Sequence, residues 1–291
     1  MKRCLACNTA FESAGWQCPS CGVAPEQRSG ILLLAPGTAE RTESYDPAWY
    51  QELARLEDAN FWFRARNRLI RWLARRHLPS RGTFLEIGCG TGYVMSMLRG
   101  EFSGWTFIGS EVHGDGLRFA GQRVGPGVEL LQIDARALPY RSEFDAVGAF
   151  DVIEHIDEDG AVLGQIHAAL KQDGVLIASV PQHKLLWSRY DEIGGHFRRY
   201  EAGDLKSLLQ RSGFRILETT SFNALLLPLL LLSRKVRRIK EEADVLDELR
   251  IGRFVNEVLA GILATEFALV RLGVRWPVGG SRIFVARKVS P

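Results

Sequence analysis

The sequence predicts a doubly wound α/β fold around a parallel sheet, and three adjacent features predict it. Residues 83–87 form a short apolar run that is typical of a buried strand. Gly88, Gly90 and Gly92 follow on alternate positions and make a turn without Cβ atoms. Residues 93–98 then resume helical spacing. Strand, turn and helix form the first crossover of such a sheet, where a nucleotide-like ligand can approach the backbone.

The composition is that of an ordinary globular protein. The chain has 291 residues, 46% hydrophobic and 24% charged, enough for one α/β domain and a smaller appendage. A net charge of +3 excludes a global basic field for nucleic acid. From Pro181 onward, however, 19 Lys and Arg stand against 12 Asp and Glu. This asymmetry indicates either a surface that meets phosphates or anionic lipid, or a solvated helix end at residues 234–238.

No secretory or membrane-spanning segment is expected. Lys2 and Arg3 are not followed by an apolar segment. The longest uncharged run, residues 219–233, contains Pro228 and is shorter than the ~20 residues needed to span a bilayer. We therefore expect a cytoplasmic protein.

Four of the five cysteines form two Cys-x-x-Cys pairs, Cys4 with Cys7 and Cys18 with Cys21. This spacing predicts four thiolates around a tetrahedral metal, so the N-terminus is expected to be a zinc knuckle or ribbon. An all-cysteine site is closed, which makes the zinc structural rather than catalytic. Two disulfides are the alternative, and a reducing cytosol disfavours them.

The segment after the cysteines changes character twice. Residues 25–44 mix Gly, Pro, Ser, Thr and charge, and are expected to be a linker. A helical apolar face then runs from Leu53 to Leu73 and ends before Pro79. The aromatic stretch from Phe61 to Arg64 either packs this helix on the sheet or closes over a ligand pocket, where aromatic faces attract cations.

Acidic residues follow three further expected strands, which are residues 105–109, 128–133 and 144–150. Glu111 lies about 20 positions past the glycine turn, where a carboxylate can accept both hydroxyl protons of a ribose. Asp134 and Ala135 follow the next strand, where the carboxylate can accept from an adenine amino group. Asp151 follows the third of these strands and begins the run Asp-Val-Ile-Glu-His155.

These motifs together resemble class I S-adenosylmethionine (SAM) methyltransferases of the type 11 and type 12 kind, including ubiquinone- and menaquinone-biosynthesis enzymes. The resemblance rests on residues 85–92, Glu111, Asp134 and residues 151–155, and covers roughly residues 60–220. It implies a Rossmann-like, doubly wound sheet of seven strands, the last antiparallel and formed by residues 283–288.

The resemblance also implies roles for individual residues. The methionine end of SAM would be shaped by the first turn, with Glu86, Gly88, Cys89, Gly90 and Gly92 as its cofactor-binding residues. Glu111 would hold the ribose, Asp134 and Ala135 the adenine, and Asp151 the rim of the pocket. His155, His183 and His196 are candidate general bases, in that order, because histidine accepts a proton near neutral pH. The alternative for His155 is a role in orienting its loop, since positioning alone can accelerate attack on an activated methyl group.

Residues 181–200 form a long, aromatic and basic loop that leaves the carboxyl end of a strand, and such loops are usually functional. Trp187, Arg198, Arg199 and Tyr200 are the candidate substrate residues. The two arginines suit an anionic acceptor such as a carboxylate or phosphate. The alternative is that they pair with Asp191, Glu192 or Glu201.

Two apolar segments precede the last strand, a leucine-rich run from Phe222 to Leu232 and a helix from Phe254 to Leu272. They are expected either to cover the sheet or to lie in a bilayer interface, with residues 234–240 on phospholipid headgroups. The predicted organisation is a zinc knuckle (1–24), a linker (25–44), a SAM-binding core (45–221), a helical insertion (222–275) and the last strand of the core (276–291).

The predicted function is SAM-dependent methylation, at oxygen or carbon, of a small-molecule or lipid-linked acceptor. Nucleic acid is not the expected partner, because the Asn/Asp-Pro-Pro-aromatic run that cradles an exocyclic amine is absent after the fourth strand. An RNA methyltransferase whose zinc module grips RNA, and a non-catalytic SAM-binding scaffold or regulator, remain the alternatives. The expected location is cytoplasmic, with peripheral contact to the inner face of an anionic membrane as a further alternative.

Overall fold

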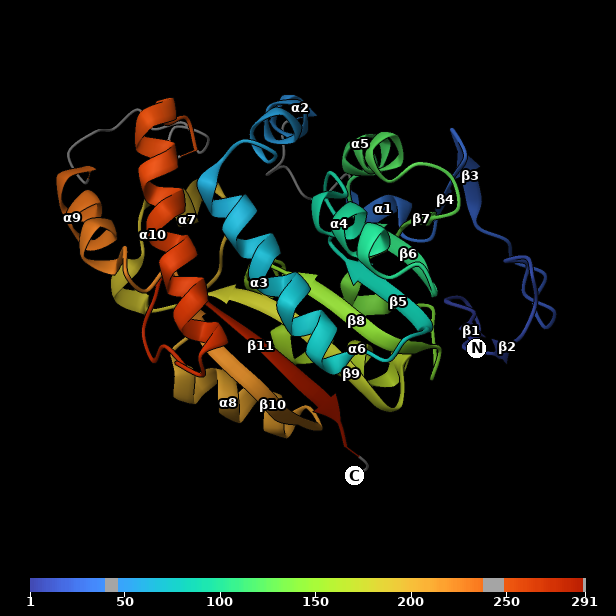
Figure 1. Ribbon diagram of the computed structural model, residues 1–291. Coiled ribbons are helices and arrows are strands. Elements are labelled where there is room, and N and C mark those ends of the chain that lie inside the picture. Colours follow the sequence, from blue (N-terminus) through green and yellow to red (C-terminus); the bar gives the residue numbers. More distant parts are fainter. Residues whose placement is uncertain (40–46, 238–248, 290–291) are drawn as a thin grey trace.

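A computed structural model describes residues 1–39, 47–237 and 249–289 (Figure 1). Its main sheet has nine strands in the order β10-β11-β9-β8-β5-β6-β7-β4-β3, and β1 and β2 form a separate pair. The strands are β1 (Lys2–Arg3), β2 (Ala10–Phe11), β3 (Glu26–Arg28), β4 (Ile31–Leu33), β5 (Gly82–Ile87), β6 (Trp105–Glu111), β7 (Glu129–Gln132), β8 (Phe144–Phe150), β9 (Leu170–Pro181), β10 (Phe214–Phe222) and β11 (Ser281–Lys288).

The centre of the sheet is parallel, from β7 through β6, β5 and β8 to β9. The last strand, β11, is antiparallel, as predicted, and it lies between β9 and β10. Because parallel strands end at the same edge, the residues that follow β5, β6, β7 and β8 are brought to one rim of the sheet.

Helices cover both faces of this sheet (Figure 1). They are α1 (Pro36–Ala39), α2 (Pro47–Leu56), α3 (Phe61–His77), α4 (Tyr93–Glu101), α5 (Gly114–Val124), α6 (Asp159–Ala169), α7 (Arg189–Ile193), α8 (Ala202–Arg211), α9 (Leu227–Arg237) and α10 (Arg253–Arg271). Alternate residues of β5 separate the two cores, since Phe84 packs with α3, α4, α5 and α10, whereas Leu85 packs with α6 and α8.

The sheet has two more strands than the seven predicted, and the segment expected to be a linker supplies both. β3 and β4 form a short hairpin, and β4 pairs in parallel with β7 through Leu32 and Leu131. The physical reason is that β7 would otherwise be an edge strand with unpaired backbone groups, and residues 31–33 cover it. A strand this short carries too little periodicity to be recognised in the sequence.

The N-terminal cysteine module is docked on the core. The Arg3 amide donates to the Pro139 carbonyl at 2.9 Å, and Trp16 packs edge-on against the buried ring of Tyr140, with ring centroids 5.6 Å apart. Trp16 therefore anchors the module to the core, whereas Phe11 packs with Cys4 and Cys18 inside the module. Since residues 139–141 precede β8, the module lies at the amino end of the parallel strands, opposite the rim.

The insertion before β11 consists of α9 and α10, and α10 packs along α3 (Figure 1). Buried Glu266 of α10 accepts the amides of residues 223–225 at 2.7–2.9 Å, and buried Asn256 accepts the Phe61 amide at 2.8 Å. The inner face of α10 thus covers the core, as expected if this apolar segment covers the sheet. The basic run expected at residues 234–240 lies partly outside the described residues. Among the described helices, none is long and apolar enough to cross a membrane.

Candidate functional site

The glycine turn after β5 needs glycine at each of its three alternate positions. Gly88, Gly90 and Gly92 have φ values of +63°, +51° and +77°, in the left-handed region that favours glycine. A Cβ on Gly88 would lie 2.5 Å from Val152, and one on Gly92 would lie 3.0 Å from Ala120. A Cβ on Gly90 would meet no atom within 4 Å. Gly90 therefore presents bare backbone to open space, as a cofactor-binding turn requires.

Glu111 ends β6 beside this turn, as predicted. Its carboxylate accepts the Gly90 amide at 3.1 Å and the Val112 amide at 2.7 Å. The side chain is buried, and burial raises the pKa of the carboxyl above its usual value. A carboxylate that reaches the backbone of the glycine turn is placed to bind the ligand that the turn receives.

Glu86 lies on β5 just before the turn and is only 2% exposed. Burial raises the pKa of its carboxyl to about 8, with Arg66 opposing and Glu57 adding to the shift. Its Oε2 atom is buried and has no hydrogen-bond partner among the residues that the structure describes. Because buried polar atoms are normally paired, this oxygen indicates a missing donor, such as the ammonium group of a bound ligand.

Sequence reasoning did not find the charged residues that brace the turn. Glu57 accepts the Thr91 hydroxyl at 2.5 Å and pairs with Arg123, which also bonds to the Thr91 hydroxyl at 2.7 Å. Glu57 follows α2 and Arg123 belongs to α5, so the pair ties two helices to the turn. No local motif marks these residues, because each acquires its partner only when the chain folds.

The predicted adenine residues lie at the end of β7. Asp134 caps the short helix η1 (Ala135–Ala137) by accepting the Arg136 amide at 2.8 Å, and its carboxylate pairs with the Arg136 guanidinium. Burial by itself raises the pKa of the Asp134 carboxyl, but the hydrogen bonds and the charge of Arg136 outweigh it, so the pKa lies below its usual value. Ala135 is buried beside it. Asp134 thus has a structural partner already, so its position allows the predicted adenine contact but does not require it.

Asp151 is held in a strained conformation at the rim, with φ at +56°. It pairs with the guanidinium of Arg66, which lies 4.6 Å from the Trp62 ring centroid. The sequence carries no local signal for this pair, because Arg66 and Asp151 are 85 positions apart. The stretch from Phe61 to Arg66 therefore reaches the rim from the side, and Phe63 is buried against Tyr93.

Two of the three candidate bases come together and the third does not join them. The rings of His155 and His196 have centroids 4.5 Å apart. Burial lowers the pKa of His155 to about 4, so the imidazole is neutral at physiological pH. His183 instead pairs with Glu201 at 3.1 Å.

The candidate substrate residues make contacts within the protein. Arg199 is buried and donates to Asp191 at 2.8 Å, as in the alternative stated for it, and Arg198 pairs with Asp157 and Asp159. The other two candidates also bond within the protein. The hydroxyl of buried Tyr200 donates to Asp159 at 3.0 Å, and the Trp187 indole donates to Glu192 at 3.4 Å. These four residues build the loop, and an anionic acceptor would have to compete for the two arginines.

Cys89 lies in the glycine turn, but its side chain packs into the core. It is buried in the core, where a Cβ on Gly109 would lie 3.2 Å from its sulfur. Burial raises the pKa of the Cys89 thiol well above its usual value. Only its backbone, which donates to the Ser110 carbonyl at 2.9 Å, can belong to the cofactor site.

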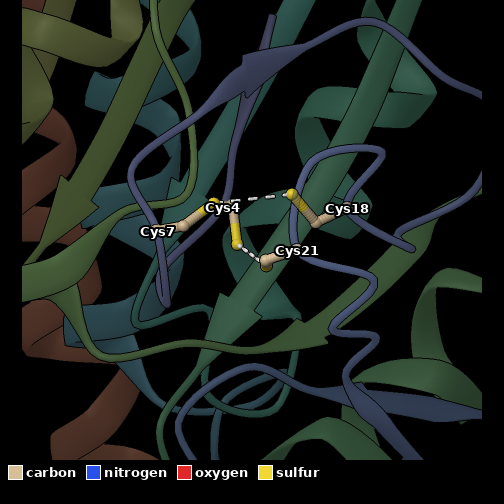
Figure 2. A group of neighbouring side chains, drawn as sticks. All are labelled: Cys4, Cys7, Cys18 and Cys21. Carbon is tan, nitrogen blue, oxygen red and sulfur yellow. Dashed lines mark hydrogen bonds between the residues drawn. The ribbon is translucent and has the colours of Figure 1, made fainter.

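The four N-terminal cysteines converge on one point (Figure 2). All are free thiols, and their sulfur atoms lie within 4.8 Å of one another. The pairs Cys4 with Cys21 and Cys7 with Cys18 are each 3.6 Å apart. A tetrahedron with metal–sulfur bonds of about 2.3 Å has sulfur atoms about 3.8 Å apart, so the cluster is suited to a metal ion.

Comparison with known proteins gives one family match. The model of the methyltransferase domain family matches residues 57–219, more than half of the chain. A probable SAM-dependent methyltransferase of Mycolicibacterium smegmatis is 26% identical over 167 residues, which cover 56% of this chain and 63% of the relative. A ubiquinone biosynthesis O-methyltransferase of Rhodopseudomonas palustris is 31% identical over 103 residues, covering 33% and 38%. The chain spans less than two thirds of the length of these relatives.

Solved structures share the fold at low identity. A phosphoethanolamine N-methyltransferase of Haemonchus contortus, solved with SAM, has a TM-score of 0.58 at 19% identity, covering 88% of this chain and 60% of that one. The cyclase SpnF has a TM-score of 0.54 at 20% identity, covering 79% and 84%. These neighbours establish a Rossmann-like α/β fold, and their different reactions illustrate that this fold does not fix the chemistry.

Proposed function

Because the chain belongs to the methyltransferase domain family, we propose that it transfers the methyl group of SAM to oxygen or carbon of a small-molecule or lipid-linked acceptor. One observation carries the proposal. The bare backbone of Gly90 donates to the Glu111 carboxylate, and Glu86, four residues before Gly90, has a buried oxygen with no donor among the described residues. A sulfonium nucleoside would satisfy both carboxyl groups, because its ammonium group can donate to Glu86 and its ribose diol can donate to Glu111.

The residues of the rim would divide the cofactor between them. Glu86 would meet the methionine ammonium, whose charge would restore the ionised form of this buried carboxyl. Glu111 would accept the two ribose hydroxyls, and the backbone at Ala135 would lie beside the adenine. Asp151, fixed by Arg66, would border the side from which the acceptor enters. Bound SAM supplies an activated methyl group, so the protein mainly has to position the acceptor in line with it.

The acceptor would lose its proton beside His155 and His196, whose rings lie in edge contact. The buried His155 imidazole is neutral, and a neutral imidazole favours a hydroxyl or an acidic carbon, whose methylation requires removal of a proton. The internal pairing of Arg199 with Asp191 argues against a requirement for an anionic acceptor.

For the N-terminal module we propose structural zinc bound by the four cysteines. Sulfur separations near those of a tetrahedral site support this reading over two disulfides. Its position at the amino end of the strands keeps it away from the methyl-transfer site, consistent with a role in stability or docking.

Incubation of cell extracts with methyl-labelled SAM tests the acceptor class. We expect label in the lipid or small-molecule fraction, and none in RNA, when extract, SAM and protein are combined. A Glu111→Gln variant serves as the control, because it removes the proposed ribose ligand and keeps the size of the side chain. Label confined to RNA would support the alternative of an RNA methyltransferase. SAM binding without any labelled product would support a scaffold.

We further propose peripheral contact with anionic membranes through the outer face of α9 and α10. Leu229, Leu232, Phe254 and Val258 are all about half exposed or more, and Phe254 reaches 82%. Large exposed apolar side chains near basic residues are typical of interfacial helices. We expect the protein to float with liposomes that contain phosphatidylserine. The double variant Phe254→Ser, Leu232→Ser is expected to remain at the bottom of the gradient. Equal flotation with neutral liposomes, or no flotation, contradicts the proposal.

A further inference from the structure

Three side chains with metal-binding atoms converge just beyond Asp151. Glu154, His155 and His196 each offer a ligand atom, and these atoms lie within 4.8 Å of one another. The first two belong to η2 (Ile153–His155), and His196 comes from the loop after α7. The loop is fixed against them, because the Phe197 amide donates to the Glu154 carbonyl at 2.8 Å.

Glu154 has no partner that explains its burial. The residue is 0% exposed, and neither carboxyl oxygen makes a hydrogen bond in the part of the chain that the structure describes. A fully buried carboxyl without a donor costs several kcal/mol, so such groups are normally paired or bound to a metal. The two guanidinium groups whose charge acts on this carboxyl, Arg66 and Arg199, are already paired with Asp151 and Asp191.

His196 is oriented in the manner of a metal ligand. Its Nδ1 atom lies 2.8 Å from an oxygen of Asp191, which is fully buried. When Nδ1 donates to this carboxylate, the lone pair of a neutral ring is on Nε2, the atom left to bind a ligand. Asp191 is itself held by Arg199 and by the Ser188 amide, both at 2.8 Å. This carboxylate–histidine arrangement commonly fixes the ring of a metal-binding histidine.

We propose that Glu154, His155 and His196 bind one divalent transition-metal ion, with Zn²⁺ and Mn²⁺ as suitable ions. Two imidazoles and one carboxylate are a common three-ligand set that leaves coordination positions open. The site is reached past the two histidines, since the His196 side chain is 19% exposed whereas Glu154 is enclosed.

The role of the ion rests on the proposed function. An acceptor hydroxyl bound at an open position would release its proton to solvent more readily, because the ion stabilises the resulting oxyanion. The oxygen would then form its bond to the SAM methyl carbon as the carbon–sulfur bond breaks, leaving neutral S-adenosylhomocysteine. A hydroxylated acceptor is therefore favoured over a carbon acceptor.

Titration of the full chain with Mn²⁺, followed by electron paramagnetic resonance of the free ion, tests the site. Mn²⁺ is the probe because the four thiolates prefer softer ions, so the N-terminal cluster does not compete for it. We expect one Mn²⁺ per chain, and at least a ~100-fold weaker affinity in Glu154→Gln and in His196→Asn. Asp191→Asn, which leaves the three ligands in place, is expected to weaken binding 10- to 100-fold.

Two controls separate this site from other effects. His183→Asn removes a histidine that pairs with Glu201 and should bind Mn²⁺ like the unmodified chain, as should Cys7→Ser. SAM calorimetry on each variant verifies that the rim remains folded. Absence of Mn²⁺ and Zn²⁺ binding beyond the cysteine cluster, with SAM still bound, would overturn the metal site and leave the methyltransferase proposal intact. Metal binding by a chain that does not bind SAM would support the metal site and overturn the methyltransferase proposal.

Discussion

Replacement of Glu111 by glutamine is expected to weaken SAM binding about 100- to 1,000-fold. Each hydrogen bond to a charged group contributes about 1.5–3 kcal/mol, and a ribose diol makes two such bonds to one carboxylate. A loss of about 3–4 kcal/mol corresponds to this range of affinity. In the unmodified chain the Gly90 and Val112 amides donate to the two carboxylate oxygens. Glutamine has one oxygen only, so its NH2 group would face one of these backbone donors. Titration calorimetry with SAM measures the effect.

The matched control is Asp115→Asn, which removes an exposed acidic side chain in the first turn of α5, four residues further along the chain. It changes the charge by the same amount and should leave SAM affinity unchanged. Equal affinities for the unmodified chain and Glu111→Gln, with both folded, would remove Glu111 from the cofactor site.

The second large effect is expected from Cys18→Ser, which should abolish stoichiometric zinc binding. Structural zinc contributes about 10–16 kcal/mol to the folding of small zinc-binding peptides, so a three-thiolate remnant should not hold the module together. Residues 1–24 should then detach from Tyr140 and be cleaved by protease at least ~10-fold faster, while SAM binding is retained. Elemental analysis and limited proteolysis measure these outcomes.

Cys89→Ser is the control for this experiment, because it removes a thiol that is buried in the core and lies outside the cluster. Its zinc content should equal that of the unmodified chain. Full zinc content in Cys18→Ser would contradict the four-cysteine site, and loss of SAM binding in that variant would contradict the separation of the two sites.

Much of the rim could be predicted because the signals are local. The glycines after β5 and the acidic residues after β6 and β7 stand at strand ends, and a parallel sheet brings such ends to one edge whatever the remaining contacts are. Glu111 illustrates this, since its distance along the chain from the glycine turn sufficed to place it beside Gly90. The four cysteines were equally local, two pairs within 24 residues.

Other features had no local signal. β3 and β4 are three residues each, and whether such a stretch becomes a strand depends on an open edge at β7. The role of Arg199 depended on Asp191, which the sequence offered only as one of several partners. Arg66 and Asp151 are 85 positions apart, and no spacing rule connects them.

The sequence by itself determined the α/β class, the glycine and acidic residues at the rim and the cysteine cluster, because these follow from periodicity, glycine placement and short spacings. Only the tertiary structure decided how Glu154, His155 and His196 meet, and that Glu154 has no donor among the described residues. Such a convergence depends on where a long loop folds back. The burial that gives a carboxyl its chemistry exists only after the core has closed over it.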